Sequence, residues 1–357
     1  MIKNILFSAM ILMGFIATAQ IPTGYYDNAI GDTGITMKIS LHNIIKGHTV
    51  VSYSSLHTHY KVTDKKPNGK VWDMYSDVPG GTPPYEFSFV KSDQCGNYKK
   101  EGDCYNREHS FPQSWFNKAK PMRSDLFHVV PTDGKVNGWR SNYPYGDVGT
   151  PTITTQNGSK LGPSITPGYS GTVFEPIDAY KGDFARNYFY MAVRYYNEDG
   201  NWQGSPSTNG AEPKPWALNL LYQWHIQDTV SQKEIDRNNA VYGIQHNRNP
   251  FIDHPEWVDT IWFYNATIPS SVKPLVQELN VKIAPNPVGS QTYLIVNNHQ
   301  QKTWIITVYD VQGRMITETQ SQGNRIGLNT ERLEAGTYIL NIHSKDLLLN
   351  KNLKFIK

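Results

Sequence analysis

The sequence is poor in cysteine and in charge, and it has no long apolar stretch beyond its first residues. Only 2 of 357 residues are Cys, and Asp, Glu, Lys and Arg together make up 18%. Cys95 and Cys104 alone do not make a zinc site, because they offer two ligands instead of four. The apolar run at residues 5–16 is shorter than the ~20 residues of a membrane-spanning helix. A polytopic membrane protein is therefore excluded.

Several common catalytic motifs are also missing. The sequence has no His-Glu-x-x-His, no Gly-x-Ser-x-Gly and no phosphate-binding loop. This excludes the usual metalloprotease, serine hydrolase and nucleoside-triphosphatase classes. The pair His57 and His59 has no cysteine or carboxylate partner at zinc-site spacing, so we expect it to serve packing or the surface.

Aromatic residues are abundant, at 12% with 22 Tyr and 9 Trp, which argues against disorder. A chain of 357 residues is too long for one ordinary core, so we expect two folded domains. Lys3, the apolar run and Ala17-Thr18-Ala19 are typical of a secretory signal peptide at residues 1–19. Export would expose Cys95 and Cys104 to an oxidising compartment, where a disulfide is favoured over free thiols.

The predicted fold class is α+β, with a mainly helical domain at residues 20–268. Apolar residues spaced three to four apart predict a helix near residues 35–45, ended by Gly47. Further helices are expected after Asp183, over residues 216–224, and from Ser231, where Glu234 completes a capping box and Pro250 ends the helix. Residues 60–105 and 143–180 are expected to be long loops, which in compact domains usually carry function.

A linker at residues 269–279 separates this domain from a second one at residues 280–357. The second domain has short β-rich runs at 292–296, 303–309, 314–319, 337–343 and 347–355, separated by turn residues. This spacing predicts a small all-β sandwich. The second domain has no cluster of catalytic groups, so we expect it to serve structure or transport.

Charge is distributed unevenly along the chain. Residues 20–279 hold 24 basic and 26 acidic residues, so the large domain is not a bulk polycation. Positive charge is concentrated at residues 99–140, with eight basic and five acidic residues. If the large domain binds nucleic acid, this stretch supplies the local attraction.

The same stretch has the densest set of reactive side chains. We expect an extended segment near residues 107–110, a return strand at residues 126–130, and a helix that begins near Thr132 or Asp133. Such a strand, strand and helix unit brings Glu108, His109 and Asn137 together around a small site. A lone Glu-His pair is more often a surface ion pair, but its combination with the segment at residues 136–142 favours catalysis.

Two motifs, Asn106-Arg107-Glu108-His109 and Val136-Asn137-Gly138-Trp139-Arg140-Ser141-Asn142, resemble the endonuclease I family of secreted nucleases. That family uses the ββα-metal, or His-Me finger, active site, and the resemblance covers most of residues 22–265. It implies His109 as the general base and Glu108 and Asn137 as metal ligands. One departure is Phe127, where many members have His, although His128 follows it.

The residue types suit phosphodiester hydrolysis. Imidazole has an unperturbed pKa of ~6.5, so neutral His109 can accept a proton from water. A hard cation prefers oxygen ligands such as those of Glu108 and Asn137, most simply Mg²⁺, with Mn²⁺ or Ca²⁺ as alternatives. Arg140 and Arg123 are predicted as catalytic contacts to phosphate. For Arg140, a buried bracing role is an equal alternative.

Three nearby groups are expected to be structural. His128 is interpreted as a strand histidine that orients its neighbours, and Asn142 as a structural residue. The polar segment at residues 247–254 lies at a helix end, where capping and loop closure explain it better than catalysis.

The second domain has its own resemblance. Ile283-Ala284-Pro285-Asn286-Pro287, Val308-Tyr309-Asp310-Val311-Gln312-Gly313-Arg314 and Leu333-Glu334-Ala335-Gly336-Thr337-Tyr338 are similar to the C-terminal sorting domain of the type IX secretion system. This implies a protein that the type IX machinery delivers outside the cell or to its surface. A carbohydrate-binding β module is the alternative for this domain.

Together these features predict a secreted, metal-dependent endonuclease of low sequence specificity, acting on DNA and, as a further substrate, RNA, with 5′-phosphate products. We expect a monomer without a stable membrane span. The alternative from another class is a secreted adhesin or glycan-binding protein in which the nuclease-like segment is inactive. Loss of plasmid nicking on chelation of the metal would separate the two.

Overall fold

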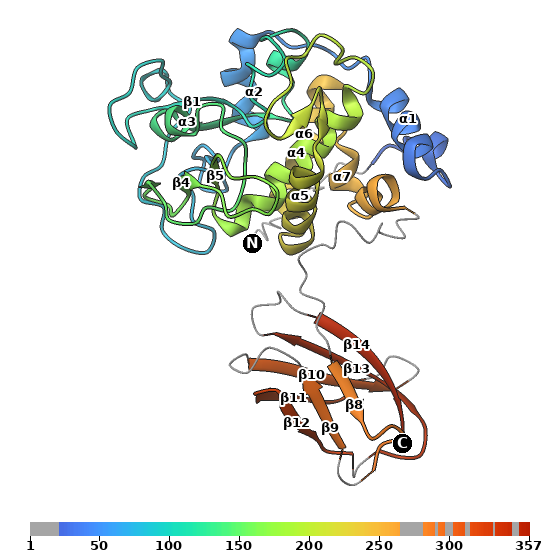
Figure 1. Ribbon diagram of the computed structural model, residues 1–357. Coiled ribbons are helices and arrows are strands. Elements are labelled where there is room, and N and C mark those ends of the chain that lie inside the picture. The colour runs from blue at the N-terminus through green and yellow to red at the C-terminus, as the bar shows by residue number, and fades with distance from the viewer. Residues whose placement is uncertain are drawn as a thin grey trace, which may run out of the picture. The chain divides into compact units, whose positions relative to one another are not determined.

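The computed structural model describes residues 21–264, 281–289, 292–296, 303–310, 315–330, 333–344 and 350–357. The chain divides into two compact units, Met1–Asn265 and Ala266–Lys357 (Figure 1). The predicted signal peptide, the linker and both domain ends at residues 268 and 280 lie outside the described residues. Within the described residues, no helix combines the length and apolar character needed to cross a membrane.

The first unit combines helices with short strands, as the α+β prediction requires. Its α-helices are α1 (Gly34–Ile45), α2 (Leu56–Thr63), α3 (Gly134–Arg140), α4 (Lys181–Arg194), α5 (Pro215–Gln227), α6 (Gln232–Gln245) and α7 (Pro250–Asp253). Short 3₁₀ turns cover Asp27–Ala29, Tyr53–Ser55, Lys91–Asp93, Met122–Ser124 and Asp178–Tyr180, and a π turn covers Asp259–Phe263. Figure 1 shows α4, α5 and α6 at the centre of this unit.

Local sequence signals explain several helix ends. α1 ends at Ile45, and Gly47 has a φ of 75°, which suits a glycine directly after a helix. The capping box of Ser231 and Glu234 is present at the start of α6, as predicted. Two expectations are wrong: Asp183 lies inside the first turn of α4, paired with Lys233, and Pro250 begins α7 instead of ending α6. Proline fits the first turn of a helix because that position needs no donor.

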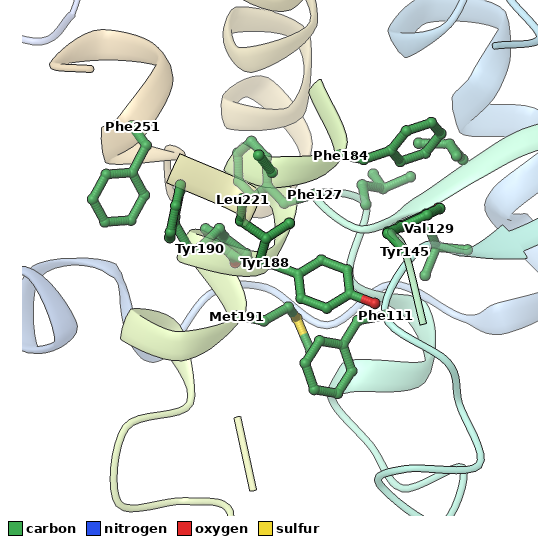
Figure 2. Close-up of a cluster of buried hydrophobic side chains, with 14 of the residues drawn as sticks. Phe111, Phe127, Val129, Tyr145, Phe184, Tyr188, Tyr190, Met191, Leu221 and Phe251 are labelled. Carbon is green, nitrogen blue, oxygen red and sulfur yellow. The ribbon is translucent and has the colours of Figure 1, made fainter. Parts of the chain in front are cut away.

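The core of the first unit is built around α4, which is buried from Gly182 to Arg194. Figure 2 shows Tyr188, Tyr190 and Met191 of α4 among aromatic and aliphatic side chains of other segments. The Tyr188 ring lies 5.2 Å from the ring of Phe111, and the Tyr190 ring lies 4.7 Å from that of Phe127. Both phenylalanines belong to the stretch with the densest set of reactive side chains, so packing against α4 holds that stretch in place.

Three small sheets complete the first unit. β1 (Tyr105–His109) pairs with β2 (Val129–Asp133), β3 (Ile153–Thr154), β4 (Lys160–Pro163) and β5 (Thr172–Glu175) form a second sheet, and β6 (Thr208–Asn209) pairs with β7 (Glu212–Pro213). The middle sheet lies in the region 143–180 that we expected to be a loop. Its strands are only two to four residues long and contain Gly162 and Pro163, so the sequence pattern of a strand is too short to detect.

The second unit is strand-rich. Its strands are β8 (Val281–Ala284), β9 (Thr292–Val296), β10 (Thr303–Asp310), β11 (Met315–Gln322), β12 (Arg325–Leu328), β13 (Thr337–Ser344) and β14 (Asn350–Ile356). They form two antiparallel sheets, with strand orders β11-β10-β13-β14 and β12-β9-β8. Both sheets contribute side chains to one apolar core, including Leu294, Trp304 and Leu340. β8 and β12 were not predicted.

Candidate active site

The predicted catalytic residues lie on a strand, a return strand and a helix. β1 and β2 are antiparallel, with Glu108 opposite Val130 and His109 opposite Val129, and α3 follows β2 directly. Asp133 caps α3, because its Oδ1 accepts the Val136 amide at 2.8 Å. Asn137 lies one turn inside this helix. The end of β1 and the middle of α3 therefore face one site.

The predicted return strand is displaced by three residues. Residues 126–128 form a turn, and β2 begins at Val129. The cause is local: the carbonyl of Asp125 accepts the amides of His128 and Val129, and its carboxylate accepts the amide of Phe127. Aspartate commonly closes such turns through its own side chain, which here prevails over the alternating apolar pattern. His128 is consequently a turn residue and not a strand residue.

A cleft of about 410 Å³ opens between these elements. Glu108, His109 and Asn137 all line it, so the structure brings the three motif residues to one surface. Polar side chains also line it, namely those of Asn106, Arg107, Gln113, Ser114, Lys118 and Asn142. Arg140 and Arg123, the two arginines predicted to touch phosphate, are not among the lining residues.

His109 has a defined tautomer in this site. Its Nε2 lies 3.0 Å from the carbonyl oxygen of Arg123. A carbonyl only accepts, so Nε2 carries the proton and Nδ1 keeps a free lone pair. Burial, with His128 nearby, lowers the pKa of His109 to about 3, so the ring is neutral near pH 7. A neutral imidazole with an open Nδ1 is the form that a general base needs.

Glu108 is held by two buried neighbours. Its Oε1 accepts the Tyr75 hydroxyl at 2.9 Å and Nη1 of Arg140 at 3.0 Å, whereas Oε2 has no hydrogen bond within residues 21–264. Burial raises the pKa of Glu108, and the charge of Arg140 opposes that rise. One carboxylate oxygen is thus fixed by the protein and the other remains available.

Arg140 is fully buried and its guanidinium is used within the protein. Besides Glu108, it donates to the carbonyl oxygens of His109 at 2.8 Å and Ser110 at 2.6 Å. Its guanidinium also lies over the Tyr145 ring at 4.6 Å. This placement agrees with the bracing alternative, because Arg140 links α3 to the end of β1 and has no exposed donor for a phosphate.

A divalent cation fits the oxygen donors of the cleft. Glu108 Oε2 and the Asn137 side-chain amide line the same cavity, and neither has a hydrogen bond in the described part of the first unit. Carboxylate and amide oxygens suit a hard cation such as Mg²⁺, which keeps several of its own waters. No group of three or more His, Cys, Asp or Glu side chains gathers at metal-binding distance in the described residues. A site with two protein ligands does not require one.

An aromatic residue absent from the motifs also lines the cleft. The ring of Tyr53 lies 4.2 Å from the Arg107 guanidinium and 4.3 Å from that of Arg123. The Tyr53 ring is also nearly parallel to the His109 ring, with an interplanar angle of 20° and 6.0 Å between centroids. Arg107 further donates to the Tyr53 carbonyl at 3.2 Å. Sequence reasoning missed Tyr53 because it lies far upstream in a short 3₁₀ turn with no motif of its own.

A tight turn at residues 112–118 also contributes to the lining of the cleft. Trp115 and Phe116 anchor it in the core, while Gln113, Ser114 and Lys118 line the cleft. Asn117 and Lys118 have φ values of 57° and 55°. Non-glycine residues rarely adopt this left-handed conformation, so the surrounding packing must hold it.

The remaining residues that the sequence singled out lie outside the cleft. His128 is buried, with Nε2 2.7 Å from the Met122 carbonyl and its ring 5.7 Å from that of His109. His57 packs at 5.3 Å from the Tyr105 ring, which agrees with the packing expectation. In the polar segment, Asn249 caps α7 and Arg248 pairs with Asp253. Its role is therefore structural.

Comparison with protein families gives two matches. Residues 33–256 match the family described as Endonuclease I. Residues 282–357 match the secretion system C-terminal sorting domain. The two matches correspond to the two units of the structure.

Curated relatives cover the first unit. The extracellular ribonuclease of Bacillus subtilis (strain 168) is 38% identical over 248 residues, which is 67% of this chain and 78% of that protein. The extracellular ribonuclease of Bacillus amyloliquefaciens is 39% identical with the same coverage. Endonuclease-1 of Buchnera aphidicola subsp. Baizongia pistaciae is 28% identical over 48% of this chain and 58% of its own.

One solved structure that matches does so only weakly. PorZ, a surface component of the type-IX secretion system of Porphyromonas gingivalis, matches 22% of this chain and 11% of its own, at 19% identity and a TM-score of 0.19. A likeness at that level supports no conclusion.

Proposed function

The chain belongs to the endonuclease I family, and from this premise we propose that it hydrolyses phosphodiester bonds of DNA and RNA by a metal-dependent, ββα-type mechanism. The protein is a secreted or cell-surface nuclease, because a secretion-system sorting domain follows the nuclease domain. Family membership does not support the adhesin alternative. The single observation that supports the mechanism is that His109, with Nε2 bonded to the Arg123 carbonyl and Nδ1 left free, lines the same cleft as Glu108 and Asn137.

His109 is the proposed general base. Because the Arg123 carbonyl holds the Nε2 proton, Nδ1 takes the proton of an attacking water. The pKa of His109 is low in the free protein. An anionic phosphate in the cleft would raise it toward the working pH, because a nearby negative charge favours the protonated form.

Glu108 and Asn137 are the proposed ligands of a divalent cation, for which we propose Mg²⁺. When bound, such a cation stabilises the negative charge that develops on the phosphate and on the leaving oxygen. Arg140 holds Oε1 of Glu108, so the second carboxylate oxygen is left for the cation. We therefore assign Arg140 a positioning role and not a phosphate contact.

The cationic groups around Tyr53 are the proposed phosphate contacts. Arg107 lines the cleft and Arg123 lies over the Tyr53 ring that lines it. Both guanidinium groups carry charge that a polyanion would neutralise, so activity should fall as salt concentration rises.

Two relatives are named extracellular ribonuclease, so RNA is a proposed substrate. Two others are named endonuclease-1, a name that specifies no nucleic acid, and we propose DNA on chemical grounds. A water nucleophile does not need the ribose 2′-hydroxyl. The same site can therefore cleave RNA and DNA, and both should give 5′-phosphate and 3′-hydroxyl ends.

The test is a product analysis on matched RNA and DNA oligonucleotides with Mg²⁺. We expect 5′-phosphate ends from both, and a loss of about 10²–10⁴-fold in turnover for His109→Ala. Chelation of the metal should abolish cleavage. A 2′,3′-cyclic phosphate product from RNA, or full activity of His109→Ala, would contradict the mechanism.

A further inference from the structure

We propose that Tyr98, in the loop closed by the Cys95–Cys104 disulfide, is a positioning residue that holds α3 and thereby sets the place of the Asn137 amide in the cleft. The inference rests on the proposed function, since it concerns a proposed metal ligand. It is drawn from the contact between this loop and two glycines of α3.

α3 is an intrinsically weak helix. It has seven residues, and two of them, Gly134 and Gly138, are glycine. Isolated helices of this length are unstable in water, and glycine is among the least favourable helix residues. Both glycines lie outside the set with positive φ, so the backbone conformation does not require them. The position of α3 must therefore come from what packs against it.

The two glycines make room for Tyr98. A Cβ atom on Gly138 would lie 2.3 Å from the Tyr98 hydroxyl oxygen and 2.9 Å from Cζ. A Cβ atom on Gly134 would lie 2.7 Å from Tyr98 Cδ1 and 3.0 Å from the Cys95 sulfur. These contacts are four residues apart, on one face of the helix. The tyrosine ring thus lies directly on the helix backbone across one full turn.

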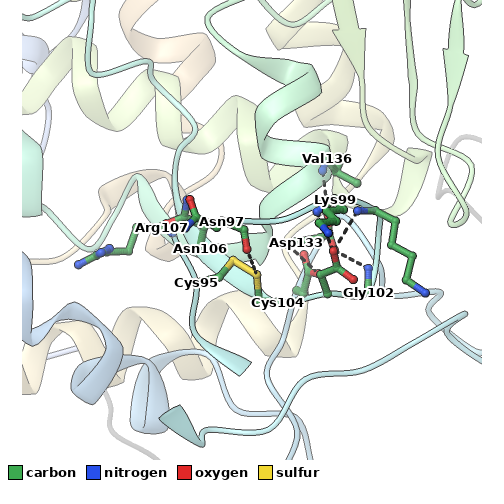
Figure 3. The surroundings of a disulfide bond; sticks show 12 residues. Cys95, Asn97, Lys99, Gly102, Cys104, Asn106, Arg107, Asp133 and Val136 are labelled. Carbon is green, nitrogen blue, oxygen red and sulfur yellow. Dashed lines mark hydrogen bonds between the residues drawn. A yellow bond between two sulfur atoms is a disulfide. The ribbon is translucent and has the colours of Figure 1, made fainter. Parts of the chain in front are cut away.

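The loop that presents Tyr98 is braced at its base. The disulfide joins Cys95 and Cys104, and the carboxylate of Asp103 accepts the amides of Lys99 at 2.7 Å and Lys100 at 3.0 Å. Figure 3 shows the disulfide beside the Asp133 carboxylate, on which the amides of Gly102 and Val136 converge.

Asp133 thereby connects the loop to the helix. One of its oxygens accepts the loop amide of Gly102 at 2.8 Å and the other caps α3. The Gly134 amide also donates to the Cys104 carbonyl at 2.9 Å. Hydrogen bonds from Asp133 and Gly134 therefore join the loop to the first turn of α3.

α3 is held from the inner side as well. Val136 and Arg140 are buried in the core, and Arg140 is tied to Glu108. Tyr98 lies on the Gly134 and Gly138 face, and Gly138 and Asn137 both line the cleft. With the ring removed, the helix can tilt away from the core at the turn that carries Asn137. The expected result is a misplaced amide oxygen and weaker cation binding.

The experiment measures Mn²⁺ affinity by calorimetry on the full chain without nucleic acid. We expect Tyr98→Ala to weaken binding by about 10-fold or more, as for loss of a residue that orients a ligand. Tyr98→Phe keeps the ring and should stay within about twofold of wild type. Tyr169→Ala is the matched control, because Tyr169 is another half-buried loop tyrosine that stacks on Trp216, outside the lining residues.

Gly138→Ala supplies an independent measure of the same contact. The added methyl group collides with Tyr98, so the single variant should weaken Mn²⁺ binding. In the Tyr98→Ala background the same change should have no further effect, because the collision partner is gone. Equal effects of Gly138→Ala in both backgrounds, or Mn²⁺ affinity of Tyr98→Ala within about twofold of wild type, would overturn the proposal. If Tyr98→Ala fails to fold, unchanged affinity in Gly138→Ala overturns it.

Asn137→Ala separates this inference from the proposed function. If wild type binds no Mn²⁺, or if Asn137→Ala binds it equally well, the proposed metal site fails. In that case amide hydrogen exchange in α3 tests the role of Tyr98 without reference to a metal. Faster exchange at residues 137–140 in Tyr98→Ala supports its role in holding the helix, and unchanged exchange rejects it.

Discussion

The first unit, which we call the nuclease unit, and the second, which we call the sorting unit, bury different kinds of side chain. In the nuclease unit, the fully buried arginines Arg140, Arg186 and Arg248 each pair with a carboxylate, on Glu108, Glu234 and Asp253 respectively. In the described part of the sorting unit, the buried polar side chains are threonines only. An apolar core suffices to make a stable sandwich, whereas the nuclease unit buries charge where it must hold particular atoms in place.

The two kinds of buried side chain differ in what their removal does to stability. Buried ion pairs add little net stability, but removal of one partner leaves a charge uncompensated in a poorly solvated site. Loss of an apolar side chain leaves only a cavity. The nuclease unit should therefore be sensitive to charge and pH, and the sorting unit to side-chain volume.

The largest effect should come from Arg140→Met. Glu108 would keep only its bond from Tyr75, and we expect the nuclease unit to lose about 3–5 kcal/mol of unfolding free energy. Denaturation followed by hydrogen exchange assigns the loss to each unit. Arg325→Met, which removes an exposed arginine over the Tyr293 ring of the sorting unit, is the control and should cost less than about 1 kcal/mol. If Arg140→Met lowered the unfolding free energy as little as Arg325→Met does, the proposed sensitivity of the nuclease unit to loss of charge would be wrong.

A cavity in the sorting unit should lower the unfolding free energy of that unit and leave that of the nuclease unit unchanged. Leu340 is fully buried on β13, and Leu340→Ala should destabilise that unit by about 2–5 kcal/mol. Nuclease activity per folded molecule should stay at the wild-type value, measured as initial rate on a DNA oligonucleotide. A rate change above about twofold would mean that the two units depend on each other.

The third test uses pH. His225 is buried, its Nε2 donates to the Pro255 carbonyl at 3.0 Å, and Nδ1 faces the Arg186 guanidinium. Burial, with Arg186 second, lowers the pKa of His225 to about 4. The unfolded chain then binds more protons than the folded one between pH 6.5 and 4, so stability falls as pH falls through this range.

His225→Gln should reduce that fall by about 1–2 kcal/mol at pH 5, a discounted fraction of 1.36 kcal/mol per pKa unit. The measurement is urea denaturation of the nuclease unit at pH 5 and pH 7 for both proteins. Parallel losses in wild type and variant between the two pH values would show that His225 does not titrate on unfolding.

The sequence predicted the elements with strong local signals. The motif at residues 106–109 and the helix segment at 136–142 carried enough spacing information to bring Glu108, His109 and Asn137 to one cleft. The capping box of α6 and the glycine after α1 were also correct.

The rest depended on contacts between distant segments. No local pattern shows that the Arg140 side chain turns inward to Glu108, since the same residue at a helix end can equally face solvent. Tyr53 reaches the cleft only because the 3₁₀ turn that carries it packs near β1. Hydrogen bonds of Asp125 determine where β2 begins, and the alternation of apolar residues along the chain gives no sign of them.

The turn at Asn117 and Lys118 has a practical consequence for anyone who engineers this enzyme. Asparagine adopts the left-handed conformation more readily than most residues, whereas Lys118 is held there at a cost of roughly 1–2 kcal/mol. Replacement of Lys118 by glycine would relieve this backbone strain and favour the folded state. It would also remove an ammonium group from the lining of the cleft, so a screen for heat resistance should be paired with an activity assay.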